Sequence, residues 1–335
     1  MKTTGAERGA FDFRRLVNHD DNIGQLLLIT AAVFVAMAAL SPEKFLRYYN
    51  FESISFTFPE LGLLSIAIMV AMLTGGIDLS IIGIANLAGV LAGVLFHRLA
   101  PGASASLGLS AVAGGIALAL AVGVVAGALN GLLIAKLRIT PILATLGTSQ
   151  VFTGLALVLT GGPAIVGFPA GWNFIGNGKI GGVAAPFVIF VALAAGVSFI
   201  LSRTAFGAKL MLIGANAKAA VFAGLDTERV VFQSYVLTGV LASVAGLILS
   251  GRTNAAKSDY GASYLLEAVL IAVLGGTNPA GGRGAVLGVS IAVLALMLLS
   301  SGFQILRFSN FLIDFIWGGF LLLVIAINVT RNRQR

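Results

Sequence analysis

The sequence predicts an all-α fold, a polytopic transmembrane bundle of about ten helices with both termini in the cytoplasm. The chain has 335 residues, of which 58% are hydrophobic and only 10% are charged. Its mean hydropathy of +1.00 lies far outside the range of soluble domains. Apolar stretches recur along the whole chain at roughly the ~20 residues that a helix needs to cross a bilayer.

The expected spans follow one another with short polar links. We place them at 23–40, 60–75, 80–97, 109–135, 141–160, 186–202, 231–250, 264–277, 284–302 and 310–328. We therefore expect one transmembrane domain at 23–330 with a cytoplasmic segment at 203–230. An N-terminal tail at 1–22 and a basic tail at 331–335 flank it, and the N-terminal tail mixes Phe and Arg as an interfacial helix does.

The net charge of +8 follows membrane topology. About two thirds of the 21 Lys and Arg residues fall on one side if both termini are cytoplasmic. This distribution explains the positive charge without nucleic acid as a partner. We expect membrane lipid to surround the chain.

The first unusual motif interrupts the apolar sequence near residue 75. It reads Thr74-Gly75-Gly76-Ile77-Asp78-Leu79-Ser80. Unpaired backbone groups are costly in lipid, so such a break persists only where protein or water covers it, and an ionisable residue there indicates a functional site. Alternatively, Asp78 is the N-cap of a helix that begins near Leu79. The two interpretations are compatible.

A second break resembles the first. Gly275-Gly276-Thr277-Asn278 ends an apolar run and continues to Gly281-Gly282-Arg283-Gly284. Paired glycine-interrupted segments in the two halves of a transporter point to the translocation path. Neither break has the Gly-Lys-Ser/Thr ending of a phosphate-binding loop.

Between the two breaks, Thr140 and Pro141 predict a helix start. Hydroxyl side chains then recur near one helix face, at Thr145, Ser149, Thr153 and Thr160. This stripe suits the lining of a path for a hydroxylated solute. Alternatively, the hydroxyls bond back to the preceding turn of their own helix. The hydroxyl stripe and the two breaks together give our candidate path residues, which are Gly75, Gly76, Asp78, Ser80, Thr145, Ser149, Gly275, Gly276, Thr277 and Asn278.

The 203–230 segment is polar enough to leave the membrane, and a short helix is expected after Asn216. Its apolar residues Ala220, Phe222 and Leu225 would suit the groove of a partner protein. Alternatively, this helix rests on the bilayer surface.

Several function classes find no support. The chain has no cysteine, and His19 and His97 are far apart, so no metal site or nucleophile is expected. We identify only Asp78 and Glu267 as acidic residues near the spans, which disfavours an ion-coupled secondary transporter, although that class and a passive facilitator remain alternatives.

Four motifs in this order resemble the ribose-type permease family of ATP-binding-cassette importers over nearly the whole chain. They are Gly75-Gly76-Ile77-Asp78-Leu79-Ser80, Thr145-Leu146-Gly147-Thr148, Gly214 with Asn216 and Ala219-Ala220, and Gly275-Gly276-Thr277 with Gly281-Gly282-Arg283-Gly284. The chain departs from the family at Ile81-Ile82-Gly83-Ile84, where Val-Gly-Ser usually follows the first motif.

The resemblance implies a multi-pass permease of the bacterial inner membrane that carries a sugar, polyol or related small polar solute and is not itself an enzyme. The implied partners are two ATP-binding subunits, an extracytoplasmic solute-binding protein and a second permease copy or related permease. ATP would be bound by the partner, and no cofactor by this chain. The implied coupling helix, which docks into the ATPase, contains Gly214, Asn216, Ala219, Ala220, Phe222, Gly224 and Leu225.

Overall fold

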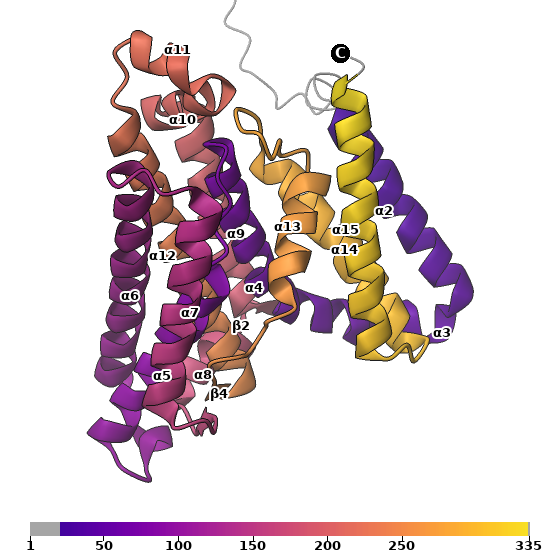
Figure 1. Cartoon of the computed structure of the whole chain (residues 1–335). Coiled ribbons are helices and arrows are strands. Elements are labelled where there is room, and N and C mark those ends of the chain that lie inside the picture. Colours follow the sequence, from indigo (N-terminus) through magenta and orange to yellow (C-terminus); the bar gives the residue numbers. More distant parts are fainter. Residues whose placement is uncertain (1–20, 334–335) are drawn as a thin grey trace, which may run out of the picture.

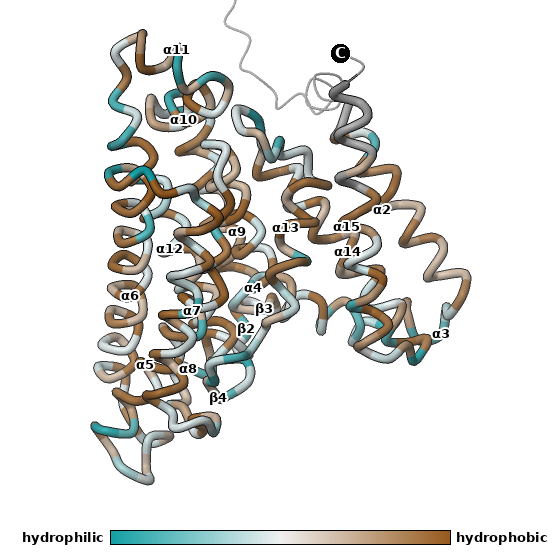
Figure 2. Tube along the Cα trace, in the orientation of Figure 1, coloured by the Kyte–Doolittle hydropathy of each residue, from teal (hydrophilic) through white to brown (hydrophobic). Residues whose placement is uncertain are grey.

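The computed structural model describes residues 21–333, and it confirms a polytopic helical bundle (Figure 1). Within this range, eight helices are long and apolar enough to cross a membrane. They are α2 (Asp21–Leu40), α4 (Tyr48–Leu73), α5 (Ile81–Leu99), α6 (Leu109–Ala135), α7 (Pro141–Thr160), α9 (Ala185–Arg203), α12 (Thr227–Thr253) and α14 (Val286–Ile305). Figure 2 shows the apolar residues along these helices and many of the hydrophilic ones in the links.

The remaining elements are shorter or lie near the C-terminus. The helices are α3 (Pro42–Phe45), α8 (Ala170–Asn177), α10 (Ala205–Ala215), α11 (Ala217–Phe222), α13 (Tyr264–Leu274) and α15 (Asn310–Arg333), with a 3-10 turn at Ser104–Ser106. Strand β1 (Ile165–Val166) pairs antiparallel with β4 (Ala255–Ala256), and β2 (Lys179–Ile180) pairs with β3 (Val183–Ala184).

Two expected spans differ from the helices that form. The span predicted at 264–277 is the 11-residue helix α13, which ends at Leu274. At 1.5 Å per residue it is about 16 Å long, roughly half the thickness of the hydrocarbon core. Helix α4 begins at Tyr48, well before the predicted residue 60, and continues through Pro59.

The described ends of the chain lie on one side of the bundle. The start of α2 and the end of α15 lie at the same end as α10 and α11, whereas α8 and β4 lie toward the other end (Figure 1). That this end faces the cytoplasm stays a prediction. The expected interfacial helix at 1–22 lies almost entirely outside the described residues. Of the expected basic tail, residues 331–333 continue α15.

The core is organised around α4 and α12. Every residue from 58 to 73 of α4 is buried, and α12 packs against α4, α5 and α6. Two glycines of α6, four residues apart, permit this packing: a methyl group at Gly123 or Gly127 would overlap the backbone of α12. Glycine at these positions therefore brings the two backbones close together.

Candidate functional site

The two glycine-rich breaks, about 200 residues apart in the sequence, contact each other. The amide of Gly282 donates a hydrogen bond of 3.0 Å to the carbonyl of Leu73, the last residue of α4. A methyl group on Gly281 would lie 2.9 Å from the amide nitrogen of Gly75, and one on Gly75 would lie 3.2 Å from the Ala280 carbonyl oxygen. The structure thus joins the ends of α4 and α13 into one site.

Both breaks use backbone conformations that favour glycine. The φ angles of Gly75 and Gly276 are 80° and 89°, and those of Gly281 and Gly282 are 102° and 79°. Asn278 holds the second break in shape, because its side chain accepts from the Ala280 amide at 3.1 Å and donates to the Gly281 carbonyl at 3.0 Å. The backbone, more than any side chain, forms the contact between the breaks.

Gly214 of α10 is the third member of this site. A methyl group there would overlap the carbonyl of Leu73 and the amide of Gly282. One on Gly281 would lie 2.7 Å from the Gly214 carbonyl oxygen. Gly214 therefore brings the segment from 203 to 230 against both breaks, and the next residue, Ala215, also lies close to Gly282.

Asp78 is fully buried beside this site and accepts three hydrogen bonds. The Ser80 amide and hydroxyl donate to Oδ1 at 3.0 and 2.6 Å, and the Thr238 hydroxyl of α12 donates to Oδ2 at 2.7 Å. The expected N-cap role is wrong in detail, because α5 begins at Ile81 with Ser80 at the N-cap and no side-chain cap bond. Asp78 instead closes a local turn with Ser80 and ties it to α12.

The network continues from Ser80 into α6 and α7. The side-chain nitrogen Nδ2 of Asn130 donates to the Ser80 hydroxyl at 2.7 Å, and the Thr148 hydroxyl donates to the side-chain oxygen Oδ1 of Asn130 at 2.6 Å. Ser80 and Asn130 are fully buried and Thr148 nearly so. Asn130 and Thr238 were not among the predicted site residues. Asn130 is an isolated amide in an apolar stretch of α6, and Thr238 is one of several hydroxyl residues of α12, so only the contact with the first break marks either of them.

Thr145 connects α7 to the first break directly. Its hydroxyl bonds back to the Pro141 carbonyl at 2.8 Å and accepts from the Leu79 amide at 3.1 Å. Ser149 and Thr153 pack against Gly83 of α5. Thr160 bonds back to the Leu157 carbonyl at 3.1 Å. Thr145 and Thr160 thus make the bond to their own preceding turn that the alternative interpretation described. As expected, α7 begins at Pro141 after Thr140, but the Thr140 side chain makes no cap bond.

A cavity of about 410 Å³ opens beside the first break. Its lining comes from Gly75, Gly76, Ile77, Thr140, Pro141, Ile142, Leu143 and Pro279. Two nearby buried hydroxyls, those of Tyr235 and Thr277, make no hydrogen bond. A methyl group on Gly76 would overlap the Tyr235 hydroxyl and lie 3.0 Å from Pro141, so Gly76 fills the narrow space between these two side chains. The cavity brings both breaks and the start of α7 together.

The predicted cytoplasmic segment forms two short helices, α10 and α11. Asn216 caps α11 by accepting from the Ala219 amide at 3.0 Å, and Gly224 follows with a φ of 77°. Of the three apolar residues expected to face a partner, only Phe222 is fully available, at 92% exposed. Ala220 is buried and Leu225 packs against the core, so the expectation is wrong for Ala220.

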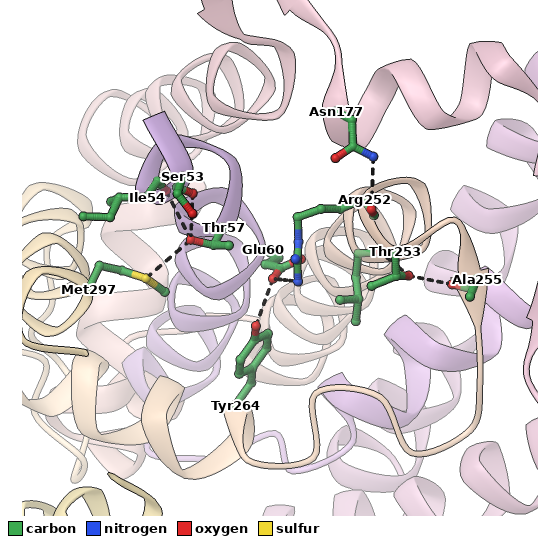
Figure 3. Close-up of polar contacts among 11 residues, drawn as sticks. Ser53, Ile54, Thr57, Glu60, Asn177, Arg252, Thr253, Ala255, Tyr264 and Met297 are labelled. Atoms are coloured by element: carbon green, nitrogen blue, oxygen red, sulfur yellow. Dashed lines mark hydrogen bonds and ion pairs between the residues drawn. The ribbon is translucent and has the colours of Figure 1, made fainter. Parts of the chain in front are cut away.

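A second polar cluster lies on α4, α12 and α13 (Figure 3). Arg252 donates to both carboxylate oxygens of Glu60, at 3.2 and 2.8 Å, and the Tyr264 hydroxyl donates to the same carboxylate at 2.9 Å. Glu60 is completely buried. It was missed as an acidic residue of the spans because it was placed at the start of a span, directly after Pro59. The other predicted acidic residue, Glu267, lies partly buried on α13.

Among the described residues, no group of three or more His, Asp or Glu side chains is placed to hold a metal ion. The buried polar groups around Asp78 are joined to one another, and the open space beside them is lined mainly by backbone and apolar side chains.

Comparison with known proteins agrees with this geometry. Residues 50–325 match the family described as branched-chain amino acid transport system / permease component. The ribose import permease protein RbsC of Bacillus subtilis is 33% identical over 94% of this chain and 96% of its own length. The autoinducer 2 import system permease protein LsrD of Yersinia enterocolitica is 32% identical over 79% of each chain, as is that of Yersinia pseudotuberculosis. No solved structure matches the chain.

The family match includes both glycine breaks, the Asp78 network, α10 and α11, and the Glu60 cluster. It also agrees with eight helices that are long and apolar enough to cross a membrane within the described range. The chain is therefore a multi-pass membrane protein and belongs to the permease-component family of branched-chain amino acid transport systems.

Proposed function

We propose that this chain is the membrane-spanning subunit of an ATP-driven importer and that it forms the path for a sugar. The observation that carries the proposal is the full-length likeness to a protein named as a ribose import permease. A sugar is neutral and rich in hydroxyls, so a path of backbone groups and uncharged side chains suits it. We place this subunit in the bacterial inner membrane.

The energy would come from partner subunits. The chain has no phosphate-binding loop of the Gly-Lys-Ser/Thr type, so an ATP-driven role requires a separate ATP-binding subunit. Phe222 at the end of α11 is an exposed aromatic side chain of the kind that anchors a protein interface. The remaining proposed partners are an extracytoplasmic solute-binding protein and a second permease copy or a related permease.

Gly214 lies where motion of the ATP-binding subunit would be passed to the two glycine breaks. A force on α11 would reach α10 through the short link at Asn216, and α10 touches Leu73 and Gly282 without an intervening side chain. Both glycine breaks would then move together, and with them Asp78 and its partners on α6, α7 and α12. Two nucleotide states of the ATPase would favour two packings of this site.

The path itself would pass the breaks. The cavity lined by Gly75, Gly76 and Pro279 is the space that a solute would enter or leave there. Ser80, Thr145 and Ser149 would act by holding the walls, since Ser80 and Thr145 are engaged in hydrogen bonds within the protein. Gly275, Gly276, Thr277 and Asn278 would form the opposite wall.

The test is solute uptake by proteoliposomes that contain the permease and the ATP-binding subunit that co-purifies with it. The solute-binding protein is added on the side of the membrane opposite the ATP-binding subunit. Labelled ribose should accumulate with ATP and not with ADP, and an ionophore that collapses ion gradients should leave the rate unchanged. Uptake that needs an ion gradient and no ATP would identify a secondary transporter. Equilibration of labelled ribose across the membrane without ATP and without an ion gradient would identify a passive facilitator.

A further inference from the structure

Two helical segments in the centre of the bundle are tied together at both ends. One is the buried half of α4 from Glu60 to Leu73, and the other is α13 from Tyr264 to Leu274. At one end the Tyr264 hydroxyl donates to the Glu60 carboxylate at 2.9 Å. At the other end the loop that follows α13 donates from Gly282 to the Leu73 carbonyl at 3.0 Å. The two segments also pack along their length, so they can move as one body.

Arg252 closes the end that lies away from Gly214. It belongs to the last turn of α12, and its guanidinium holds both oxygens of Glu60, as Figure 3 shows. The side chain of Asn177 donates to the Gly251 and Arg252 carbonyls at 3.0 Å each. This contact anchors the end of α12 to α8. The cluster therefore joins the α4–α13 pair to α8 and to the last turn of α12, at the end of the bundle away from α10 and α11, although α12 as a whole also contacts both of these helices.

The ion pair has the properties of a contact with two discrete states. Glu60 is fully buried, whereas the Arg252 side chain is 26% exposed, so the cluster reaches the surface of the chain on the arginine side. A buried carboxylate needs its full set of partners, and a partly separated pair is unfavourable. The contact is thus either made, as here, or broken and hydrated.

The polypeptide around the cluster also allows separation. Helix α13 covers only about half of the membrane thickness. The chain between Thr253 and Tyr264 contains two residues of strand and no helix. Discontinuous helices of this kind flank the solute path in membrane transporters. Tyr264 stands where the half-helix begins and holds Glu60 of α4, so a tilt of the α4–α13 pair would carry Glu60 and Tyr264 together away from Arg252.

We propose that Glu60, Arg252 and Tyr264 form the closure of the solute path at the end opposite α10 and α11, opened when the α4–α13 pair tilts. This inference rests on the proposed transport function. Movement at Gly214 shifts Leu73 and Gly282, the paired segments carry it along their length, and the ion pair breaks at the far end. The three residues act as positioning residues, since they hold helices and need not touch the solute.

The test uses the absence of cysteine from the chain. A reporter cysteine replaces Ala268, which is fully buried on α13 one turn beyond Tyr264. A membrane-impermeant maleimide is added on the side opposite α10 and α11. In the parent, labelling should be slow without nucleotide. With Arg252→Gln or Glu60→Gln it should become about tenfold faster without nucleotide, because the open packing gains population. Tyr264→Phe should also increase the labelling rate without nucleotide, but by a smaller factor.

Two controls separate closure from general loosening. Lys257→Gln removes a cation from the same region, where Lys257 pairs with the exposed Asp259 at 2.9 Å, and it should leave labelling unchanged. A second reporter at Ala242, which is fully buried on α12, should stay slow in all variants. The double variant Glu60→Gln with Arg252→Gln should exceed neither single variant, because both remove the same contact. ATP hydrolysis should continue while uptake falls.

The outcomes distinguish the two proposals. If the parent shows no ATP-dependent uptake, the proposed function fails. If the parent transports but Arg252→Gln and Tyr264→Phe both label at the parental rate, the closure is refuted and the transport function stands. Faster labelling at Ala242 and Ala268 alike would also refute the closure, since the ion pair would then be a general structural bond. If Arg252→Gln does not assemble, Tyr264→Phe decides, because it removes a single oxygen atom.

Discussion

The backbone of Gly214 in α10 lies directly against the carbonyl of Leu73, with no room for a methyl group between them. Leu73 is the last residue of α4, and its carbonyl also accepts the Gly282 amide. The end of the most deeply buried helix therefore touches both the segment after α13 and the segment between α9 and α12. Displacing one of these three segments has to displace the others.

The first prediction tests this contact. Gly214→Ala should lower the free energy of unfolding by about 1 to 3 kcal/mol, the usual effect of forcing a methyl group into a packed site. It should also slow uptake at unchanged membrane insertion. The matched control is Gly196→Ala on α9, where a methyl group meets no atom within 4 Å. Thermal unfolding in detergent gives the comparison, and equal melting temperatures for the two variants would contradict the close approach.

Much of this architecture could be predicted from local sequence. Apolar length located the helices, and the Gly-Gly pairs after Leu73 and Leu274 located both breaks, because positive φ angles favour glycine. The start of α7 at Pro141 followed from the proline itself. The four-residue spacing of Gly123 and Gly127 in α6 is typical of close helix packing, although such a spacing does not identify α12 as the partner helix.

What could not be predicted depends on contacts between residues far apart in the chain. Nothing near Asn130 or Thr238 indicates that each reaches the first break, since a polar side chain in a span has many available partners. The ion pair of Glu60 could not be predicted either, because its partner Arg252 lies 192 residues away. The burial of Ala220 in α11 likewise depends on how that helix docks. Sequence spacing fixes a helix face, but tertiary packing decides what that face meets.

The second prediction concerns Asp78. Asp78→Ala should destabilise the protein by several kcal/mol, because hydrogen bonds to a charged group contribute about 1.5–3 kcal/mol each and three are lost. Asp78→Asn should lose less stability, since the side-chain amide oxygen of asparagine can still accept a hydrogen bond. The control is Asp226→Asn, an exposed N-cap that bonds the Arg229 amide at 3.0 Å, where the loss should be within about 1 kcal/mol. Chemical unfolding of the purified variants measures all three, and equal losses for Asp78→Asn and Asp226→Asn would refute the network.

If Asp78→Asn assembles with near-normal stability and yet fails to transport, the carboxylate acts in the path or its gate. Normal uptake by the same variant would show that its role is to hold the turn before α5. Loss of assembly in both Asp78→Asn and Asp78→Ala would leave a purely structural buried charge.

The third prediction uses the chain of bonds from Ser80 to Asn130. Ser80→Ala and Asn130→Leu should each destabilise the protein by about 1 to 3 kcal/mol, because each leaves a buried polar partner unpaired. The double variant should cost less than their sum by 0.5 kcal/mol or more, roughly the coupling expected for groups in contact. A pair without contact, Ser80→Ala with the exposed Lys218→Ala, provides the additive control. Additive losses in the first pair would mean that Ser80 and Asn130 act independently.

The fourth prediction fixes the orientation. Because the chain has no cysteine, Lys218→Cys on α11 and Ser106→Cys after α5 can each be labelled alone, and both native side chains are exposed. In intact cells an impermeant maleimide should label Ser106→Cys and not Lys218→Cys, since the basic residues predict that α11 faces the cytoplasm. The pattern should reverse in inside-out vesicles. Labelling of Lys218→Cys in intact cells would invert the assigned topology.

The fifth prediction concerns the surface that would receive the ATPase. Phe222 is 92% exposed, so Phe222→Asp should leave the stability of the isolated permease unchanged. Leu225 is unsuited to this test because it packs against the core. If Phe222 anchors the partner, its replacement should weaken binding of the co-purifying ATP-binding subunit by about 2 kcal/mol or more, roughly thirtyfold, as removal of an interface hot spot does. The matched control is Leu109→Asp, an exposed apolar residue at the start of α6 away from α11, which should bind the ATPase normally. Affinity measured in detergent gives the comparison, and equal binding by both variants would mean that α11 lies on the bilayer surface instead.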